Sequence, residues 1–169
     1  MKAQATALGH PIHPMLIVFP LGLFPVAVIF DLIYWFGHNP TWAQVSYWVI
    51  AAGIIGALLA AVFGLIDWLK IPSGTRAKTI GLVHGMTNVI VAGLFIVSWL
   101  LRRPNPTAPD MLDVGLGIIG VLLALFAGWL GGELVYRLNI GVDEGAHPDA
   151  PSSLSDRPST DRVAGPRWV

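Results

Sequence analysis

Four long apolar stretches dominate the sequence, and each is long enough to cross a lipid bilayer as a helix. They cover residues 14–36, 44–69, 79–101 and 111–137. A helix needs about 20 residues to span a bilayer at a rise of about 1.5 Å each, and a segment in lipid must satisfy its own backbone hydrogen bonds. The sequence therefore predicts an all-α integral membrane protein, a four-helix transmembrane bundle.

The composition agrees with this class of protein. The 169 residues are 54% hydrophobic and only 12% charged, with a mean hydropathy of +0.67, which is far too apolar for an ordinary soluble domain. The first stretch is too long for the apolar part of a cleaved signal peptide, so we expect it to be retained. We divide the chain into an N-terminal segment (1–8), a transmembrane domain (9–138) and a polar tail (139–169) that is predicted to be disordered and cytoplasmic.

The first and third stretches repeat one another. His13, Met15, Val18, Gly22, Leu23, Phe24 and Val26 recur without gaps as His84, Met86, Val89, Gly93, Leu94, Phe95 and Val97. The second and fourth stretches also match, because Gly53-Ile54-Ile55-Gly56 recurs as Gly117-Ile118-Ile119-Gly120. Two matches in consistent order predict a duplicated helical hairpin, whose halves are related by a pseudo-twofold axis along the membrane normal.

Small residues at four-residue spacing line the second and fourth stretches. Such stripes allow close approach of helix backbones in lipid. We therefore expect these two helices to pack tightly, near the axis. The stripes consist of Gly56, Ala60 and Gly64 in one stretch and of Gly120, Ala124, Gly128 and Gly132 in the other.

In the first stretch, Pro20 and Pro25 each remove a backbone donor and predict a bent helix.

The distribution of basic residues predicts the orientation. Under the positive-inside rule, the side with more lysine and arginine faces the cytoplasm, so both termini are expected there. On the opposite side, Asp31 is expected to reach the interface, and Arg102 with Arg103 to anchor a helix end. The basic residues on the side of the termini are Lys2, Lys70, Arg76, Lys78 and Arg137.

The net charge of +0 offers no basic surface for nucleic acid.

No motif of an enzyme is present. The sequence contains no cysteine, which excludes disulfides, thiolate metal sites and covalently attached c-type haem. A glycine-rich phosphate loop, a nucleophile elbow and a His-Glu-x-x-His zinc motif are also missing. No catalytic residue is predicted, and the sequence favours a non-enzymatic role.

Ionisable residues within membrane spans are costly and usually mark function. Here His13, Asp67, His84 and Glu133 all fall at the end of the bundle that carries the termini. His10 adds a third imidazole, one turn from His13 if the first helix starts early. Asn88 lies four residues from His84, hence on the same helix face.

Three interpretations compete for this cluster. The repeated histidines, His13 and His84, would supply the two axial ligands of a b-type haem, with Asp67 and Glu133 orienting the rings. Alternatively, His10, Asp67 and Glu133 would join them around a divalent metal such as zinc or iron. The third interpretation is structural, with ion pairs such as Glu133 with Arg137 at four-residue spacing. Our leading hypothesis is haem, in a redox-linked or anchor subunit, and the alternative is a cofactor-free interaction subunit of a larger membrane complex.

Several phrases in combination give a resemblance to a known family. They are His10-Pro11-Ile12-His13-Pro14, Asp67-Trp68 with Ile71-Pro72-Ser73-Gly74-Thr75, Gly81-Leu82-x-His84, and Gly131-Gly132-Glu133-Leu134-Val135-Tyr136. Over about residues 9–142 the chain resembles the bacterial DUF2231 proteins, predicted small membrane proteins of unknown function. The resemblance implies a multi-pass protein of the bacterial cytoplasmic (inner) membrane. Relatives that are joined to Rieske-type or cytochrome-like domains imply a membrane redox complex, or a protein of these types, as partner.

Overall fold

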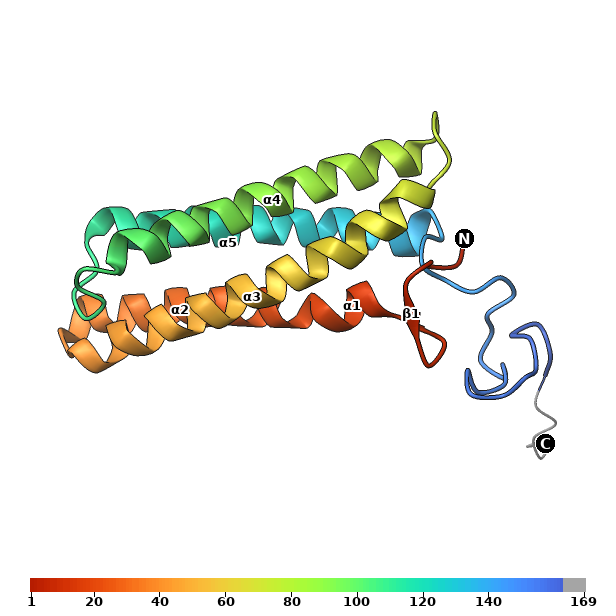
Figure 1. The fold of residues 1–169 in the computed structure, drawn as a ribbon, viewed down its shortest axis with the longest axis horizontal. Coiled ribbons are helices and arrows are strands. Elements are labelled where there is room, and N and C mark those ends of the chain that lie inside the picture. The colour runs from red at the N-terminus through yellow and green to blue at the C-terminus, as the bar shows by residue number, and fades with distance from the viewer. Residues whose placement is uncertain (163–169) are drawn as a thin grey trace.

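The computed structural model describes residues 1–162, in which four apolar helices of membrane-spanning length form a bundle (Figure 1). The N-terminus and the described part of the tail lie at one end, which we call the terminal end, and the opposite end is the distal end. Each predicted apolar stretch lies within one of the four spans Ile12–Gly37, Pro40–Lys70, Arg76–Arg102 and Met111–Arg137, so the predicted four-helix bundle is confirmed. The elements are α1 (Ile12–Leu16), α2 (Val18–Gly37), α3 (Pro40–Lys70), α4 (Arg76–Arg102), α5 (Met111–Gly132) and the π-helical turn η1 (Glu133–Arg137).

Local capping explains where three of these helices begin. The Asn39 side chain accepts a hydrogen bond from the Thr41 amide at 3.0 Å at the start of α3, where Pro40 takes the first helical position. Thr75 caps α4 in the same way, and Asp110 with Asp113 forms a capping box at the start of α5. Polar side chains therefore set the helix starts between the apolar stretches.

The first spanning helix is interrupted at Ile17, between α1 and α2. Pro20 lies just beyond the break and has no amide hydrogen to donate to the carbonyl of Leu16, one turn earlier. The predicted bend of this helix stays a prediction. Pro25 lies inside α2, which continues through it.

A short β-hairpin precedes α1 and attaches to the bundle. Strands β1 (Thr6–Ala7) and β2 (His10–Pro11) pair antiparallel, and the turn places Leu8 and Gly9 at φ 51° and 81°, the left-handed conformation that tight hairpin turns need. Asp67, near the end of α3, accepts hydrogen bonds from the amides of Gln4 and Ala5 at 2.7 and 3.2 Å. The N-terminal segment is thus held at the terminal end.

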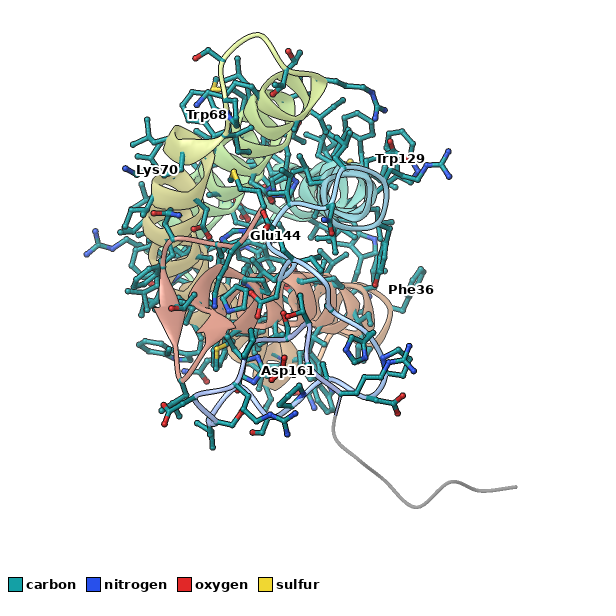
Figure 2. The ribbon with its side chains drawn as sticks, turned by 90° about the vertical axis from the view of Figure 1, so that its right-hand side faces the viewer. Phe36, Trp68, Lys70, Trp129, Glu144 and Asp161 are labelled. Carbon is teal, nitrogen blue, oxygen red and sulfur yellow. The ribbon has the colours of Figure 1, made fainter. Side chains whose placement is uncertain are left out.

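The helices run around the bundle in chain order, as the end-on view in Figure 2 shows. Neighbouring helices are α2 with α3, α3 with α4, α4 with α5, and α5 with α2, so α3 and α5 lie diagonally. At the centre the repeated residues Phe24 and Phe95 stack at 3.8 Å between ring centroids, with planes 6° apart. The two hairpins therefore meet across an axis on which equivalent residues face each other.

The glycines of α3 and α5 receive rings from the preceding helix of the same hairpin. A Cβ built on Gly53 would lie 2.6 Å from the ring of Phe24, and one built on Gly120 would lie 2.6 Å from that of Phe95. Gly53 is thus equivalent to Gly120. The sequence alignment, which paired Gly53 with Gly117, is wrong by about one helical turn.

The second and fourth helices, α3 and α5, make their main contacts with the neighbouring helices of the bundle. Their small residues accommodate Phe and His side chains of the neighbouring α1, α2 and α4 instead of a second glycine-bearing backbone. Gly128, part of the predicted stripe, has no such neighbour, because a Cβ there would meet nothing within 4 Å.

These contacts separate two substitutions in the same helix. Gly120→Leu should destabilise the protein by about 1–3 kcal/mol, because the new side chain overlaps the Phe95 ring. Gly128→Leu is the matched control and should leave stability unchanged. Thermal unfolding in detergent measures both, and equal melting temperatures for the two variants would contradict this packing.

Candidate functional site

The repeated histidines lie together at the terminal end of the axis. His13 comes from α1 and His84 from α4, and their ring centroids are 6.4 Å apart with planes at 83°. The predicted approach of these two residues across the bundle is therefore observed.

Each ring is held by a backbone carbonyl, that of His13 by a carbonyl of α3 and that of His84 by a carbonyl of α5. His13 Nδ1 lies 2.8 Å from the carbonyl oxygen of Ala60, and His84 Nδ1 lies 2.9 Å from that of Ala127. A carbonyl only accepts hydrogen bonds, so Nδ1 carries the hydrogen in both rings. In a neutral imidazole the lone pair is then on Nε2.

Glycines let the rings lie against the neighbouring helices. A Cβ on Gly64 would be 2.9 Å from Cε1 of His13, and a Cβ on Gly131 would be 3.4 Å from Cε1 of His84. These contacts pair Gly64 with Gly131, which is the same register that pairs Gly53 with Gly120 in the phenylalanine contacts deeper in the bundle. Glycines at structurally equivalent positions of the two hairpins thus contribute directly to how the histidines are held.

Asn88 contacts His84, as its four-residue spacing predicted. Its Nδ2 lies 3.3 Å from His84 Nε2 and donates to the His84 carbonyl at 2.9 Å. Within residues 1–162, no hydrogen bond to Nε2 of His13 is found. The two imidazoles therefore differ in that only one has its second nitrogen occupied.

The other predicted site residues have partners elsewhere. Asp67 binds the N-terminal segment, and His10, on β2, lies 3.2 Å from the Ser153 hydroxyl. Glu133 pairs with Arg76 at 2.8 Å, so the suggested pairing with Arg137 is wrong. The reason is that Glu133 opens the π-helical turn, in which the four-residue spacing no longer brings side chains onto one face.

No third metal ligand joins the histidine pair. Within residues 1–162, no group of three His, Cys, Asp or Glu side chains is placed to share one ion. The structure therefore does not bring His10, Asp67 and Glu133 together with His13 and His84.

A buried ion pair, which sequence reasoning missed, lies near the distal end. Arg102 donates to the two carboxylate oxygens of Asp31 at 2.7 and 2.8 Å, and both residues are only 1% exposed. Arg102 also donates to the Ser46 hydroxyl at 3.3 Å, which in turn donates to the carbonyl of Ala27. The expectations that Asp31 reaches the interface and that Arg102 anchors a helix end are wrong, because the two charges neutralise each other inside the bundle.

The sequence did contain a signal for this pair. Asp31 follows Phe24 at the same interval at which Arg102 follows Phe95. The two charged residues are thus equivalent positions of the repeat, just as the histidines are. The signal was opposite charge, and not identity, at one repeat position.

Some polar atoms beside the ion pair have no protein partner. Trp99 Nε1, Arg102 Nε and Asp113 Oδ1 are buried without a hydrogen bond to any of residues 1–162. Buried donors and acceptors of this kind are commonly satisfied by ordered water.

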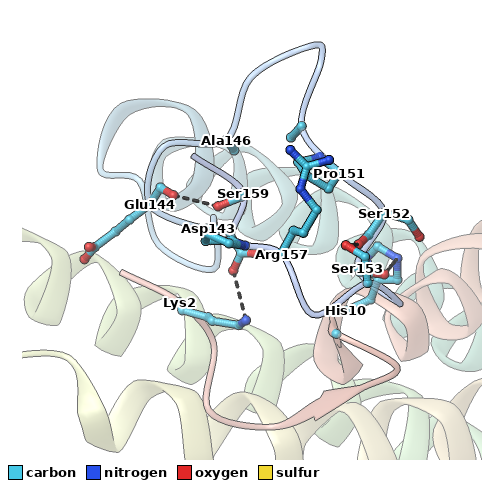
Figure 3. A pocket seen from close by; sticks show the side chains of 14 residues that line it. Lys2, His10, Asp143, Glu144, Ala146, Pro151, Ser152, Ser153, Arg157 and Ser159 are labelled. Carbon is cyan, nitrogen blue, oxygen red and sulfur yellow. Dashed lines mark hydrogen bonds and ion pairs between the residues drawn. The ribbon is translucent and has the colours of Figure 1, made fainter. Parts of the chain in front are cut away.

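A cavity of about 620 Å³ lies outside the bundle, between the N-terminal segment and the tail (Figure 3). Lys2 pairs with Asp143 at 3.5 Å across it, and the Ser159 hydroxyl donates to the carbonyl of Glu144 at 2.7 Å. Neither His13 nor His84 lines this cavity. The predicted disorder of the tail stays a prediction, and residues 163–169 lie outside the described residues.

Comparison with known proteins places the chain in one family. Residues 9–144 match the family described as Predicted membrane protein (DUF2231). No curated protein and no solved structure matches the chain.

The buried pair yields a direct test of stability. Arg102→Met should destabilise the protein by about 3–5 kcal/mol, because it leaves the Asp31 carboxylate buried without its counter-ion. Arg103→Met, at the exposed neighbouring residue, is the control and should cost far less. Unfolding in detergent compares the two, and equal losses would show that Arg102 is not buried as described.

Proposed function

This chain belongs to the DUF2231 family of predicted membrane proteins. We propose that His13 and His84 hold one b-type haem in a redox-linked or anchor subunit. What supports this is the state of the two rings. Both donate through Nδ1 to a backbone carbonyl, which orients the ring. The Nε2 lone pair of His13 is left for a ligand, whereas that of His84 first has to be released by Asn88. Metal-binding histidines are commonly held by this second-nitrogen contact.

The number of ligands favours haem over a simple metal ion. Two imidazoles would suffice to hold a b-type haem. A structural or catalytic zinc site takes three or four protein ligands. Within residues 1–162 only two are in place, so haem fits the donor set better than zinc does.

The porphyrin also needs space beside the rings. Neither His13 nor His84 lines either of the two described cavities, so haem binding requires α1 and α4 to separate at the terminal end. Pro20 donates no hydrogen bond to the carbonyl of Leu16, which lowers the cost of such a movement of α1 relative to α2. Asn88 would release Nε2 of His84 and keep its bond to the His84 carbonyl. Once bound, the haem would supply reversible one-electron transfer.

The location of the site suggests the partner. We propose that the chain is a multi-pass protein of the bacterial cytoplasmic membrane, with the terminal end in the cytoplasm, because that end carries Lys70, Arg76 and Lys78 in one short region. The haem would then lie near the cytoplasmic face, within reach of a membrane redox complex or a Rieske-type or cytochrome-type protein.

The experiment is a visible spectrum of protein purified from haem-replete cells. We expect a haem spectrum that is reduced by dithionite and lost in His13→Ala and in His84→Ala. His38→Ala is the matched control, because His38 lies just after α2 at the distal end and should leave the spectrum unchanged. A folded, colourless and iron-free wild-type protein would refute the proposal.

One observation favours a second function, a cofactor-free interaction subunit. His84 already uses both nitrogens, through Ala127 and Asn88, so the ring is satisfied without a ligand. In that case His84→Ala would lower the melting temperature of the protein, and no preparation would contain iron.

A further inference from the structure

Three pairs of equivalent residues meet on the axis of the bundle. His13 faces His84, Phe24 stacks on Phe95, and Asp31 binds Arg102. In the first two pairs the same residue occupies both positions. Only in the third pair do the two hairpins carry different residues, and these have opposite charges.

This pattern bears on how one hairpin chooses another. We name α1 to α3 the N-terminal hairpin, and α4 with α5 and η1 the C-terminal hairpin. If two N-terminal hairpins faced each other, histidine would again meet histidine and phenylalanine would meet phenylalanine. Shape at these positions therefore does little to prevent like hairpins from pairing.

The charged pair does discriminate. Two like hairpins would place Asp31 against Asp31, or Arg102 against Arg102, at a position where both side chains are only 1% exposed. A buried charge without a counter-ion is strongly destabilising, and a second like charge adds repulsion. Unlike hairpins instead form a bidentate pair at 2.7 and 2.8 Å.

We propose that the Asp31–Arg102 pair selects the pairing of unlike hairpins, so that the inner face of each hairpin accepts only a hairpin of opposite charge at this position. In the native chain that occupant is the other hairpin of the same molecule. The loop Ile71–Thr75 joins the two and keeps them together.

The surroundings of the pair agree with this assignment. Ser46 in the N-terminal hairpin accepts a hydrogen bond from Arg102, so this hairpin offers a carboxylate and a hydroxyl to the guanidinium. In the register that pairs Gly53 with Gly120, the residue equivalent to Ser46 is Asp113. The C-terminal hairpin thus offers the Asp113 carboxylate to a guanidinium from a facing hairpin, so selection by charge acts most strongly against two N-terminal hairpins, in which Asp31 would meet Asp31 without a cation.

Charge reversal tests the proposal in single chains. Arg102→Asp places a second carboxylate against Asp31 and should reduce the yield of folded monomer about tenfold or more. Asp31→Arg creates a like-charge pair beside Asp113 and should also reduce the yield, to a smaller extent. The double variant D31R/R102D restores opposite charges, with Asp113 near the new guanidinium, and should recover most of the monomer. Failure of the double variant to exceed the single variants would overturn the proposal.

Coexpression gives a second, independent measurement. The D31R and R102D chains, carrying different affinity tags, should co-purify as a dimer that exchanges hairpins, because each hairpin then finds opposite charge in the other chain. Two differently tagged D31R chains should not co-purify, and neither should D31R with R103D, the control at the exposed neighbour. Equal co-purification in all three combinations, or none in the first, would contradict selection by charge.

These readouts do not depend on haem. The tags and the 18.1 kDa monomer are followed by affinity capture and size in detergent, whereas the proposed function is followed by iron and colour. Either proposal can therefore fail while the other holds.

Discussion

The bundle depends on rings that lie against glycine. Lipid gives apolar helices no hydrophobic reason to associate, so association needs close packing and buried polar contacts. Here Phe24 on Gly53 and Phe95 on Gly120 bring each hairpin together, and the same two rings then stack across the axis. The contact within a hairpin and the contact between hairpins share one pair of side chains, so neither can change alone.

The spans could be predicted from sequence because length and hydropathy decide them, and the duplication because identical residues recur along the first and third helices. The register that relates the second helix to the fourth could not be predicted from the sequence. Their matching letters are mostly Gly, Ile, Leu and Ala, which align almost as well when shifted by one turn. Only the rings, which belong to other helices, determine that Gly53 corresponds to Gly120.

The candidate site was predictable to a similar extent. His13 and His84 are the same residue at one repeat position, so their meeting followed from the symmetry. The partners of Asp67 and Glu133 did not follow from the symmetry. That of Asp67 depends on an N-terminal segment that folds back onto the bundle, and that of Glu133 depends on a π-helical turn. Asp31 and Arg102 are equivalent but not identical, so the repeat of identical residues does not connect them.

The hydrogen bonds of the two serines record how the halves have diverged. Ser46 donates to the carbonyl of Ala27 between α3 and α2, and Ser98 donates to the carbonyl of Asp113 between α4 and α5. In the register that pairs Gly53 with Gly120, Ser46 is equivalent to Asp113, and in the repeat of the first and third helices Ala27 is equivalent to Ser98. The two hydrogen bonds therefore join the same two positions, but the hydroxyl comes from α3 in one half and from α4 in the other. A bond of equal geometry has thus been kept while its donor and acceptor exchanged places. Once two copies of a hairpin share one chain, evolution can conserve a contact without conserving the residue that makes it.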